Sequence, residues 1–411
     1  MTRLLRSRSG ALVAAFIPST LATGLTQISI PLELRQLHAS PVATGVALSM
    51  FGLGMVLFEG GWGAIADRLG YRVPLITSQL LYAVAIFVLA HAGTVPLVAI
   101  GYLIASGMMV AAGPLGRSFL GTTLPPSLRA TGLAFISAQW VVAGALGSGA
   151  GGALIDRLPI GTVLEITAVL PLASAGLLAL ALRGYRETRG IWAGLEGDVE
   201  PVSDDSGRGF VRVLLITAAI VLLAEVGAGG EIALLPLLVT NHLHQSAATA
   251  GTAMLVVGLL AGLLLVPGGM ASDRWGRRPT MVAGGLISAA GFAVYAIAGS
   301  FGAIVAGAAL RAVGSALVWP AATAWISEAA PQRRHALVMG LYGEFENLGI
   351  FIGPVAGGFV WGAFGIQAAF AGYAAGAVAM ALVAAVTVGG GRARATIPVG
   401  ELTHDREPDR V

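Results

Sequence analysis

The chain has 411 residues, of which 56% are hydrophobic and only 11% are charged. An ordinary soluble domain carries about a quarter charged residues, so this composition cannot cover a water-soluble surface. All 24 basic residues are arginine, and they stand in short segments between apolar stretches, which argues against a nucleic-acid-binding stripe. Cysteine is absent, which excludes disulfides and thiol chemistry. The composition indicates a helical membrane protein.

Twelve apolar stretches are long enough, or nearly so, to cross a hydrocarbon core, which takes roughly 20 helical residues. The first one exceeds the roughly 7 to 15 residues of a signal-peptide core, so it is expected to be a retained helix. The expected spans lie near residues 11–34, 43–66, 73–92, 95–117, 130–155, 160–182, 213–239, 247–271, 280–298, 301–326, 336–362 and 368–388. The predicted fold class is therefore an all-α membrane protein with 12 transmembrane helices.

The arginines predict the orientation of these spans. If the N-terminus is cytoplasmic, only Arg35 and Arg157 fall on outer loops, whereas every other arginine outside the spans falls on an inner segment. Cytoplasmic loops carry the basic excess in membrane proteins, so both termini are expected in the cytoplasm. A multi-pass protein of the plasma membrane is expected, in a bacterium or archaeon its inner membrane.

The chain divides into two groups of six spans. Residues 1–182 form the first group and residues 213–390 the second, and the segment 183–212 between them is polar, acidic and without apolar periodicity. This segment is expected to be a cytoplasmic linker, and residues 391–411 a disordered cytoplasmic tail. The protein is expected to be monomeric.

A charged loop recurs in the two groups at an offset of 273 − 67 = 206 positions. The shared positions are Gly63, Asp67, Arg68, Gly70 and Arg72 in the first copy and Gly269, Asp273, Arg274, Gly276 and Arg278 in the second. At the same offset, Gly147 and Gly151 match Gly353 and Gly357. Two sequence-related six-helix halves are typical of transporters built from repeats around a central site.

Each position of this loop has a physical reading. Gly70 and Gly276 supply the positive φ that a short turn between antiparallel helices needs. Asp67 and Asp273 stand at the membrane edge, where a carboxylate is costly unless it meets an arginine or a helix N-terminus of the other half. A latch between the halves is the favoured interpretation, and simple topology anchoring is the alternative.

These two loops resemble the signature of the major facilitator superfamily, Gly-x-Leu-Ala-Asp-Arg-x-Gly-Arg-Arg, and the likeness extends over nearly the whole chain. The resemblance implies two pseudo-symmetric six-helix bundles around a cavity that opens alternately to each side. It also implies that the first, fourth, seventh and tenth helices line this cavity. Asp67, Arg68, Arg72, Asp273, Arg274 and Arg278 would then latch the inner face.

A second resemblance concerns the eleventh span. Gly353, Pro354, Gly357 and Gly358 are similar to the Gly-Pro-x-x-Gly-Gly element that proton-driven exporters of the superfamily carry in the fifth span, where this chain has Ser148 in place of the proline. The alternative interpretation is close packing of helices through small residues.

Ionisable groups inside spans are functional candidates by default, because burying one costs several kcal/mol. Glu225 in the seventh span and Arg311 in the tenth lie at similar expected depths, and the resemblance, which places these two helices around the cavity, makes them the first candidates for the central site; a purely structural ion pair is the alternative. Glu231 follows three glycines that could unwind the helix and serve gating, but it could also lie in water near the outer surface.

Further candidates lie in the eleventh, second and first spans. Glu344 and Glu346 are about 200° apart around one helix, so both can hardly face one cavity. Glu344 shares its face of the helix with Asn347 and is the favoured cavity or proton-binding group. Glu346 shares its face with the packing glycines. Glu59 lies at a depth similar to that of Glu346, and the resemblance implies that the second span packs against the eleventh, so Glu59 is a candidate for sharing a proton with Glu346; structural hydrogen bonding is the alternative. Gln27 is a candidate polar group of the cavity, with helix packing as the alternative.

The leading hypothesis is a secondary active transporter that exports an apolar or amphipathic compound in exchange for protons. A proton-coupled importer of a nutrient or organic anion, gripped by Arg311, is the alternative. The chain has no lysine and hence no Walker-type lysine, so ATP is not expected to drive transport directly. Histidines and carboxylates show no metal-ligand spacing within a span, which makes a membrane-embedded enzyme remote, and no cofactor or metal is expected.

Overall fold

The computed structural model describes residues 7–185, 205–330 and 335–388. Within these ranges every regular element is a helix, and 12 spans are long and apolar enough to cross a membrane. The sequence prediction of 12 transmembrane helices is confirmed. The first six residues, most of the linker and the tail lie outside the described residues, so the expectations for those parts stay predictions.

The first half contains six membrane-crossing segments, two of which are broken into two helices. Its elements are α2 (Arg8–Ala15), α3 (Ile17–Gln36), α4 (Pro41–Leu69), α5 (Arg72–Leu89), α6 (Val95–Met109), α7 (Ala112–Thr123), α8 (Pro126–Ile155) and α9 (Ile160–Ala181).

The second half repeats this order with fewer breaks. Its elements are α10 (Asp205–Leu237), a π-helical turn η2 (Leu238–His242), α11 (Ala247–Trp275), α12 (Arg277–Ala296), α13 (Phe301–Ala329), α14 (His335–Phe364) and α15 (Ile366–Thr387).

Proline explains both breaks in the first half. A proline has no N–H to donate and its ring collides with the carbonyl group four residues earlier. Pro114 therefore ends α6 near Val110, and Pro18 breaks the first span at Phe16, between α2 and α3. In both places the two helices still form one continuous membrane-crossing segment.

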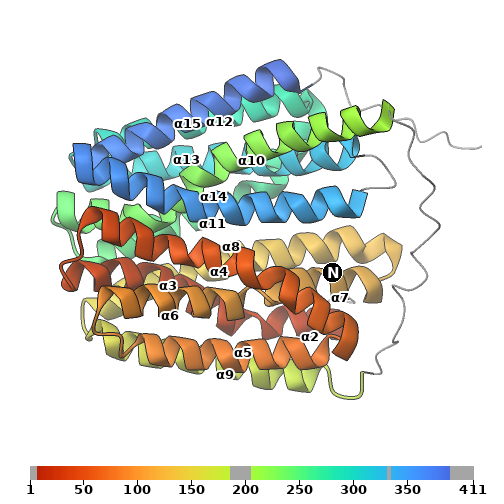
Figure 1. The fold of residues 1–411 in the computed structure, drawn as a ribbon, viewed down its shortest axis with the longest axis horizontal. Coiled ribbons are helices and arrows are strands. Elements are labelled where there is room, and N and C mark those ends of the chain that lie inside the picture. The colour runs from red at the N-terminus through yellow and green to blue at the C-terminus, as the bar shows by residue number, and fades with distance from the viewer. Residues whose placement is uncertain (1–6, 186–204, 331–334, 389–411) are drawn as a thin grey trace, which may run out of the picture.

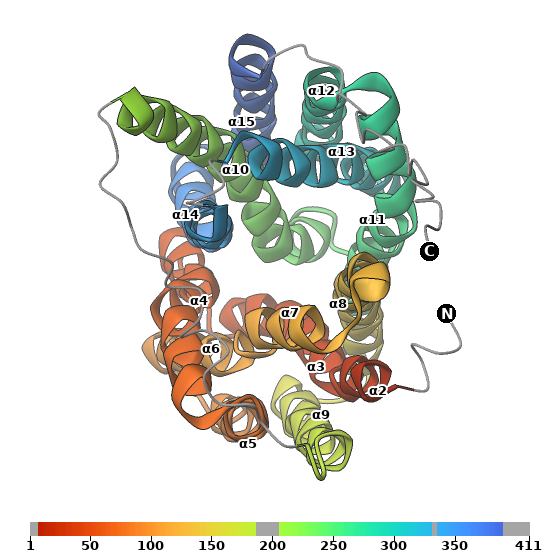
Figure 2. The same cartoon turned by 90° about the vertical axis from the view of Figure 1, so that its right-hand side faces the viewer.

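The two halves lie side by side, and their helices run along one common direction (Figure 1). We call the end of the molecule that carries the segment between α9 and α10 the linker end, and the other end the far end. The start of α2 and the end of α15 both lie at the linker end (Figure 1). Across the boundary between the halves, α4 packs along α14 and α8 packs along α11 (Figure 2).

One boundary differs from the sequence prediction. The linker was expected to reach residue 212, but α10 already begins at Asp205, while its membrane-crossing part begins at Val211. A helix satisfies its own backbone groups and so continues beyond the apolar stretch that hydropathy detects. The end of a hydrophobic run therefore marks the membrane edge and not the end of the helix.

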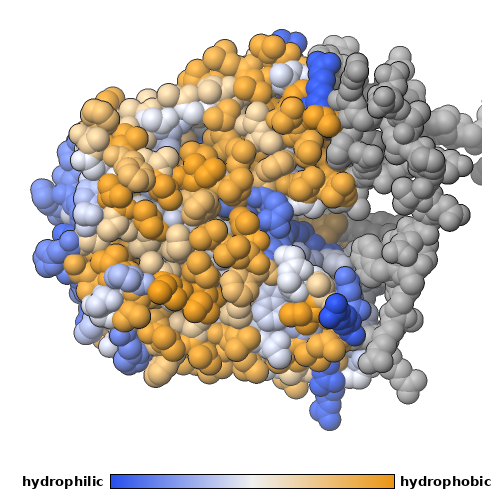
Figure 3. Space-filling view, viewed as in Figure 1, coloured by the Kyte–Doolittle hydropathy of each residue, from blue (hydrophilic) through white to orange (hydrophobic). Residues whose placement is uncertain are grey.

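Apolar side chains cover the flanks of the molecule, and polar ones gather at its ends (Figure 3). Leu180, Leu263 and Val386 are 66%, 71% and 84% exposed, an arrangement that water would penalise and lipid favours. The chain is thus a multi-pass membrane protein. The cytoplasmic placement of the linker end rests on the arginines alone and stays a prediction.

Glycines bring the helices of each half into close contact. A Cβ atom at Gly147 would collide with the Leu21 carbonyl oxygen on α3, and one at Gly151 would meet Ile28 of the same helix. In the second half, a Cβ atom at Gly353 would collide with the Val226 carbonyl oxygen on α10, and one at Gly357 would meet Leu234 of the same helix. The matched glycines of the repeat therefore sit at matched helix contacts.

Replacement of Gly147 by alanine is expected to destabilise the protein. The added methyl group meets a backbone carbonyl that cannot rotate away, and overpacking of this kind costs about 1–3 kcal/mol. Gly144, one turn earlier on α8, has nothing within 4 Å of an added Cβ. Gly144→Ala should therefore leave stability unchanged or raise it by the helix preference of alanine, about 0.5–1 kcal/mol. Thermal unfolding in detergent compares the two variants, and equal unfolding temperatures would contradict the close contact at Gly147.

Candidate functional site

A cavity of about 490 Å³ lies between the two halves. It is lined from the first half by α3, α4, α6, α7 and α8, and from the second by α10, α11, α13 and α14. Most of the lining is apolar, with Trp140 and Trp319 facing it from opposite halves. A largely apolar cavity of this size is typical of sites for drug-sized molecules. The four spans expected to line it do so, together with four of their neighbours.

The cavity is closed at the far end and widens toward the linker end. At the far end α4 touches α14 at Gly45 and Gly358, where an added Cβ would lie 2.8 Å from the opposing backbone. Toward the linker end the same two helices diverge (Figure 1), and Gly60 and Gly343 have nothing within 4 Å of an added Cβ. The lining extends to the exposed Arg117 on α7. A hollow between the halves is visible on this side (Figure 3).

The most tightly held charged group of the cavity is Arg311 of α13. Its Nε donates a hydrogen bond of 3.0 Å to Glu231 of α10, and its Nη1 donates one of 2.8 Å to Ser288. Its guanidinium carbon lies 4.0 Å from the centre of the Phe292 ring. Tyr295 donates a hydrogen bond of 2.9 Å to the other oxygen of Glu231. Both charges are buried and satisfied, and removing one partner of such a pair typically costs about 3–5 kcal/mol.

The ion pair of Arg311 is thus with Glu231, whereas the sequence pointed to Glu225. The depths explain the difference when both are counted from the far end. Arg311 lies 311 − 301 = 10 residues from the start of α13, and Glu231 lies 242 − 231 = 11 residues from the end of η2. Both are therefore about 15–17 Å deep, whereas Glu225 is about 9 Å further along α10.

The expected unwinding of α10 before Glu231 is wrong, and so is the wet position considered for Glu231. The helix continues through Gly227, Gly229 and Gly230 to Leu237, and Glu231 is 5% exposed. These glycines serve close packing instead: an added Cβ at Gly229 would meet the backbone of α14, and one at Gly230 the ring of Tyr373. The irregular turn lies later, in η2, which follows Pro236.

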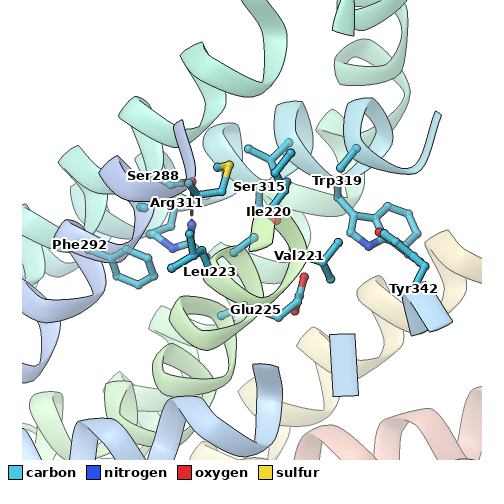
Figure 4. A pocket seen from close by; sticks show the side chains of 16 residues that line it. Ile220, Val221, Leu223, Glu225, Ser288, Phe292, Arg311, Ser315, Trp319 and Tyr342 are labelled. Atoms are coloured by element: carbon cyan, nitrogen blue, oxygen red, sulfur yellow. Dashed lines mark hydrogen bonds between the residues drawn. The ribbon is translucent and has the colours of Figure 1, made fainter. Parts of the chain in front are cut away.

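Glu225 lies where the central cavity meets a side pocket of about 40 Å³. The side pocket lies within the second half and is lined mainly by apolar residues, with Ser288, Arg311 and Ser315 among its polar ones. In Figure 4, Arg311 lies on one side of the Glu225 carboxylate, and Trp319 and Tyr342 lie on the other. Within the described part of the chain, Glu225 has no hydrogen-bond or ion-pair partner.

Glu346 faces the cavity, which corrects the preference for Glu344. Trp319 donates a hydrogen bond of 2.7 Å from its indole N–H to Glu346. Glu346, Asn347 and Ile350 line the cavity together, whereas Glu344 does not. Glu346 lies on the same face of α14 as Gly353 and Gly357. This face packs on α10 at the glycines and borders the cavity at Glu346.

Asn347 and Glu59 join the two halves beside this cluster. The amide of Asn347 on α14 donates a hydrogen bond of 2.6 Å to Glu59 on α4. Both residues line the cavity, and so does Gln27 of α3. The expected approach of the second span to the eleventh is therefore observed, although the direct neighbour of Glu59 is an amide and not another carboxylate.

The turns of the two charged loops have the predicted backbone conformation. Gly70 has φ 78° and Gly276 has φ 97°, so the prediction of left-handed glycines is confirmed. The described residues show no ion pair between the two loops. Asp273 instead pairs with Arg277, four residues later in the same loop. Arg277 also donates a hydrogen bond of 2.7 Å to Glu328 on α13, which ties the second loop to its own half.

Sequence reasoning missed the role of Arg277 because it followed the residues shared by both loops. The position 206 residues earlier is Tyr71, whose hydroxyl lies 2.9 Å from that of Ser118 on α7. Each loop is therefore fastened to its own half by a different side chain at the same position. The mismatch between Arg277 and Tyr71 within a matched motif was the available signal.

Comparison with known proteins agrees with this architecture. The family model of the Major Facilitator Superfamily matches residues 12–229 and residues 214–403. An uncharacterized MFS-type transporter of Salmonella typhimurium is 26% identical over 360 residues, covering 84% of this chain and 87% of that protein. Multidrug resistance protein 2 of Bacillus subtilis is 28% identical over 176 residues, covering 43% of this chain and 42% of that protein.

Solved structures share the fold at low sequence identity. The nucleoside transporter NupG has a TM-score of 0.74 at 15% identity, covering 92% of this chain and 98% of that one. A bacterial homolog of the human lysosomal transporter Spinster, in an inward-facing and unoccupied conformation, has a TM-score of 0.72 at 14% identity, covering 92% and 94%. With two matched halves around a central cavity, this chain belongs to the major facilitator superfamily and is a membrane transporter.

Proposed function

We propose that this transporter exports amphipathic, positively charged compounds in exchange for protons. The observation that carries the proposal is the central cavity, which combines a mainly apolar lining with an excess of carboxylates. Glu59, Glu225, Glu231 and Glu346 line it, against Arg117 and Arg311. Because Glu231 and Arg311 bind each other, three carboxylates remain with one arginine at the mouth.

This charge balance favours a cation. An amphipathic ammonium or phosphonium compound would bury its apolar body against Met55, Met109 and Met254 and its charge beside Glu225 or Glu346. Trp140 and Trp319 offer ring faces that attract a cation further. The matches to a multidrug resistance protein and, over 127 residues at 34% identity, to a triacylglyceride transporter of Mycobacterium tuberculosis agree with an apolar cargo.

The same geometry disfavours the import of an organic anion. In that reading Arg311 grips a carboxylate of the substrate. Its guanidinium is already bound by Glu231 and Ser288 and stacked on Phe292, so a substrate would have to displace a buried ion pair. Arg117 is exposed at the mouth of the cavity, where water and salt screen its charge. This position suits the attraction of an anion to the mouth better than tight binding of its carboxylate.

Glu225 is our candidate for the coupling group. Its carboxylate faces both the cavity and the side pocket and has no partner among the described residues. It can therefore bind a proton or pair with a cationic substrate, but a single carboxylate does not do both. Mutually exclusive binding of this kind is sufficient for exchange. The latch of the two charged loops would close the linker end in the other conformation, and the linker end is proposed to face the cytoplasm.

Replacement of Glu225 by glutamine is expected to abolish proton-coupled transport, because the side-chain amide neither binds nor releases a proton near neutral pH. Proteoliposomes that contain a pH-sensitive dye measure the proton flux when substrate is added. Glu33→Gln is the matched control, since Glu33 lies in a membrane span but does not line the cavity. Proton-coupled flux that persists with glutamine at position 225 would rule out Glu225 as the coupling group.

Tetraphenylphosphonium is expected to stabilise the purified protein more than the neutral triphenylphosphine oxide does, because a ligand raises apparent stability in proportion to its binding. The unfolding temperature in detergent is the measurement. Glu225→Gln should reduce the difference between the two probes. Stabilisation by the anion tetraphenylborate in preference to the cation would reverse the proposed charge selectivity.

A further inference from the structure

A carboxylate of the first half caps a helix of the second half at the far end of the molecule. Asp156 follows the last residue of α8. Its Oδ1 accepts a hydrogen bond of 3.0 Å from the backbone N–H of Ala247, and its Oδ2 accepts one of 3.1 Å from that of Ala248. Both oxygens are thus occupied by the first turn of α11.

This contact completes the N-terminus of α11. The first N–H groups of a helix have no partner within the helix. Ser246 is the N-cap residue of α11, and its hydroxyl accepts from the N–H of Thr249. Asp156 accepts from the two N–H groups before it, so the local cap and the cap from the other half together satisfy the first turn.

The charge of Asp156 suits this position as well. The N-terminus of a helix carries a partial positive charge, which an aspartate stabilises. One turn deeper, an added Cβ at Gly152 would lie 3.0 Å from the Cα of Gly251, so the two helices are in backbone contact directly behind the cap. The bonds therefore exist only while the far ends of α8 and α11 touch.

We propose that Asp156 is the gating residue of the far end. Its carboxylate binds α11 in the conformation whose cavity opens at the linker end. When the cavity opens at the far end, α8 and α11 must separate there, and both hydrogen bonds break. Asp156 thereby adds stability to one conformation of the transport cycle and not to the other, without contacting substrate.

The separated state exposes both partners to water, which limits the energy of the cap to a modest amount. Capping and charge interactions with a helix N-terminus have sizes that change an equilibrium about five- to thirtyfold. A shift of this size alters which conformation dominates but leaves both accessible. This is the property a gate needs, because a stronger bond would stop the cycle.

The experiment measures the distance between the halves at each end, and the absence of native cysteines makes site-specific spin labelling direct. Cysteines at Thr94 and Gly299 report on the far end, and cysteines at Thr122 and Leu337 report on the linker end. Asp156→Ala is expected to increase the population with separated far ends about five- to thirtyfold. The linker-end distance should shorten in the same fraction of molecules.

Two variants separate gating from general damage. Glu165→Ala removes a carboxylate at the same end, but Glu165 pairs with His91 inside the first half. The distances between the spin labels should therefore stay unchanged in this variant. Asp156→Asn keeps one carbonyl acceptor and loses the charge, so it should give an intermediate shift. Opposite changes at the two ends distinguish a shifted equilibrium from loss of structure, which would broaden both distances.

Unchanged distances in a folded Asp156→Ala protein would overturn the proposal, as would an equal shift in Glu165→Ala. The measurement needs neither substrate nor a proton gradient. Its outcome is therefore independent of the proposed cargo and of the coupling role of Glu225.

Discussion

Everything in this molecule depends on the contact between two pairs of antiparallel helices from opposite halves. In one pair α4 runs against α14, and in the other α8 runs against α11. At the far end these contacts are made by glycines, because a Cβ atom at these positions would lie within about 3 Å of the backbone of the facing helix. Small residues let two helix backbones approach this closely. In lipid no hydrophobic effect drives the halves together, so such close packing and a few polar bonds carry the association. The cavity exists because the same helices part toward the linker end.

The polar groups divide according to this geometry. Where the helices of one half converge, charges are paired and buried, as Arg311 and Glu231 are. Two other carboxylates of the cavity are bound by neutral donors, Glu59 by Asn347 of the other half and Glu346 by Trp319 of its own half. The pair of Arg311 and Glu231 is thus held within one half, whereas Asn347 and Glu59 bind each other across the two halves. Glu225 lies at the boundary of the two environments.

The sequence predicted the number of spans, the two halves and the left-handed glycines, because hydropathy, repetition and turn chemistry are local properties. It misassigned the partner of Arg311 because hydropathy places the ends of a span only to within a few residues, so the depths of Glu225 and Glu231 could not be distinguished. It expected α10 to unwind at its glycines, but packing against α14 and α15 keeps this helix unbroken. It preferred Glu344 to Glu346 because a helical wheel gives directions around a helix but not the positions of its neighbours. Asp156 escaped notice since an acid after a span looks like an ordinary loop residue until α11 is placed beside it.

The register of the helix pairs connects the two ends of the molecule. Gly45 faces Gly358 and Gly52 faces Phe351, so each step along α4 is matched by an equal step back along α14. Continued toward the linker end, this register sets Gly60 opposite Gly343. It also sets Asp67 opposite the first turn of α14, which begins at His335. Asp156 stands in the same relation to the first turn of α11, where its hydrogen bonds are formed. In the described conformation the carboxylate cap is therefore made at the far end, where the helices touch, whereas Gly60 and Gly343 near the linker end have no close neighbour.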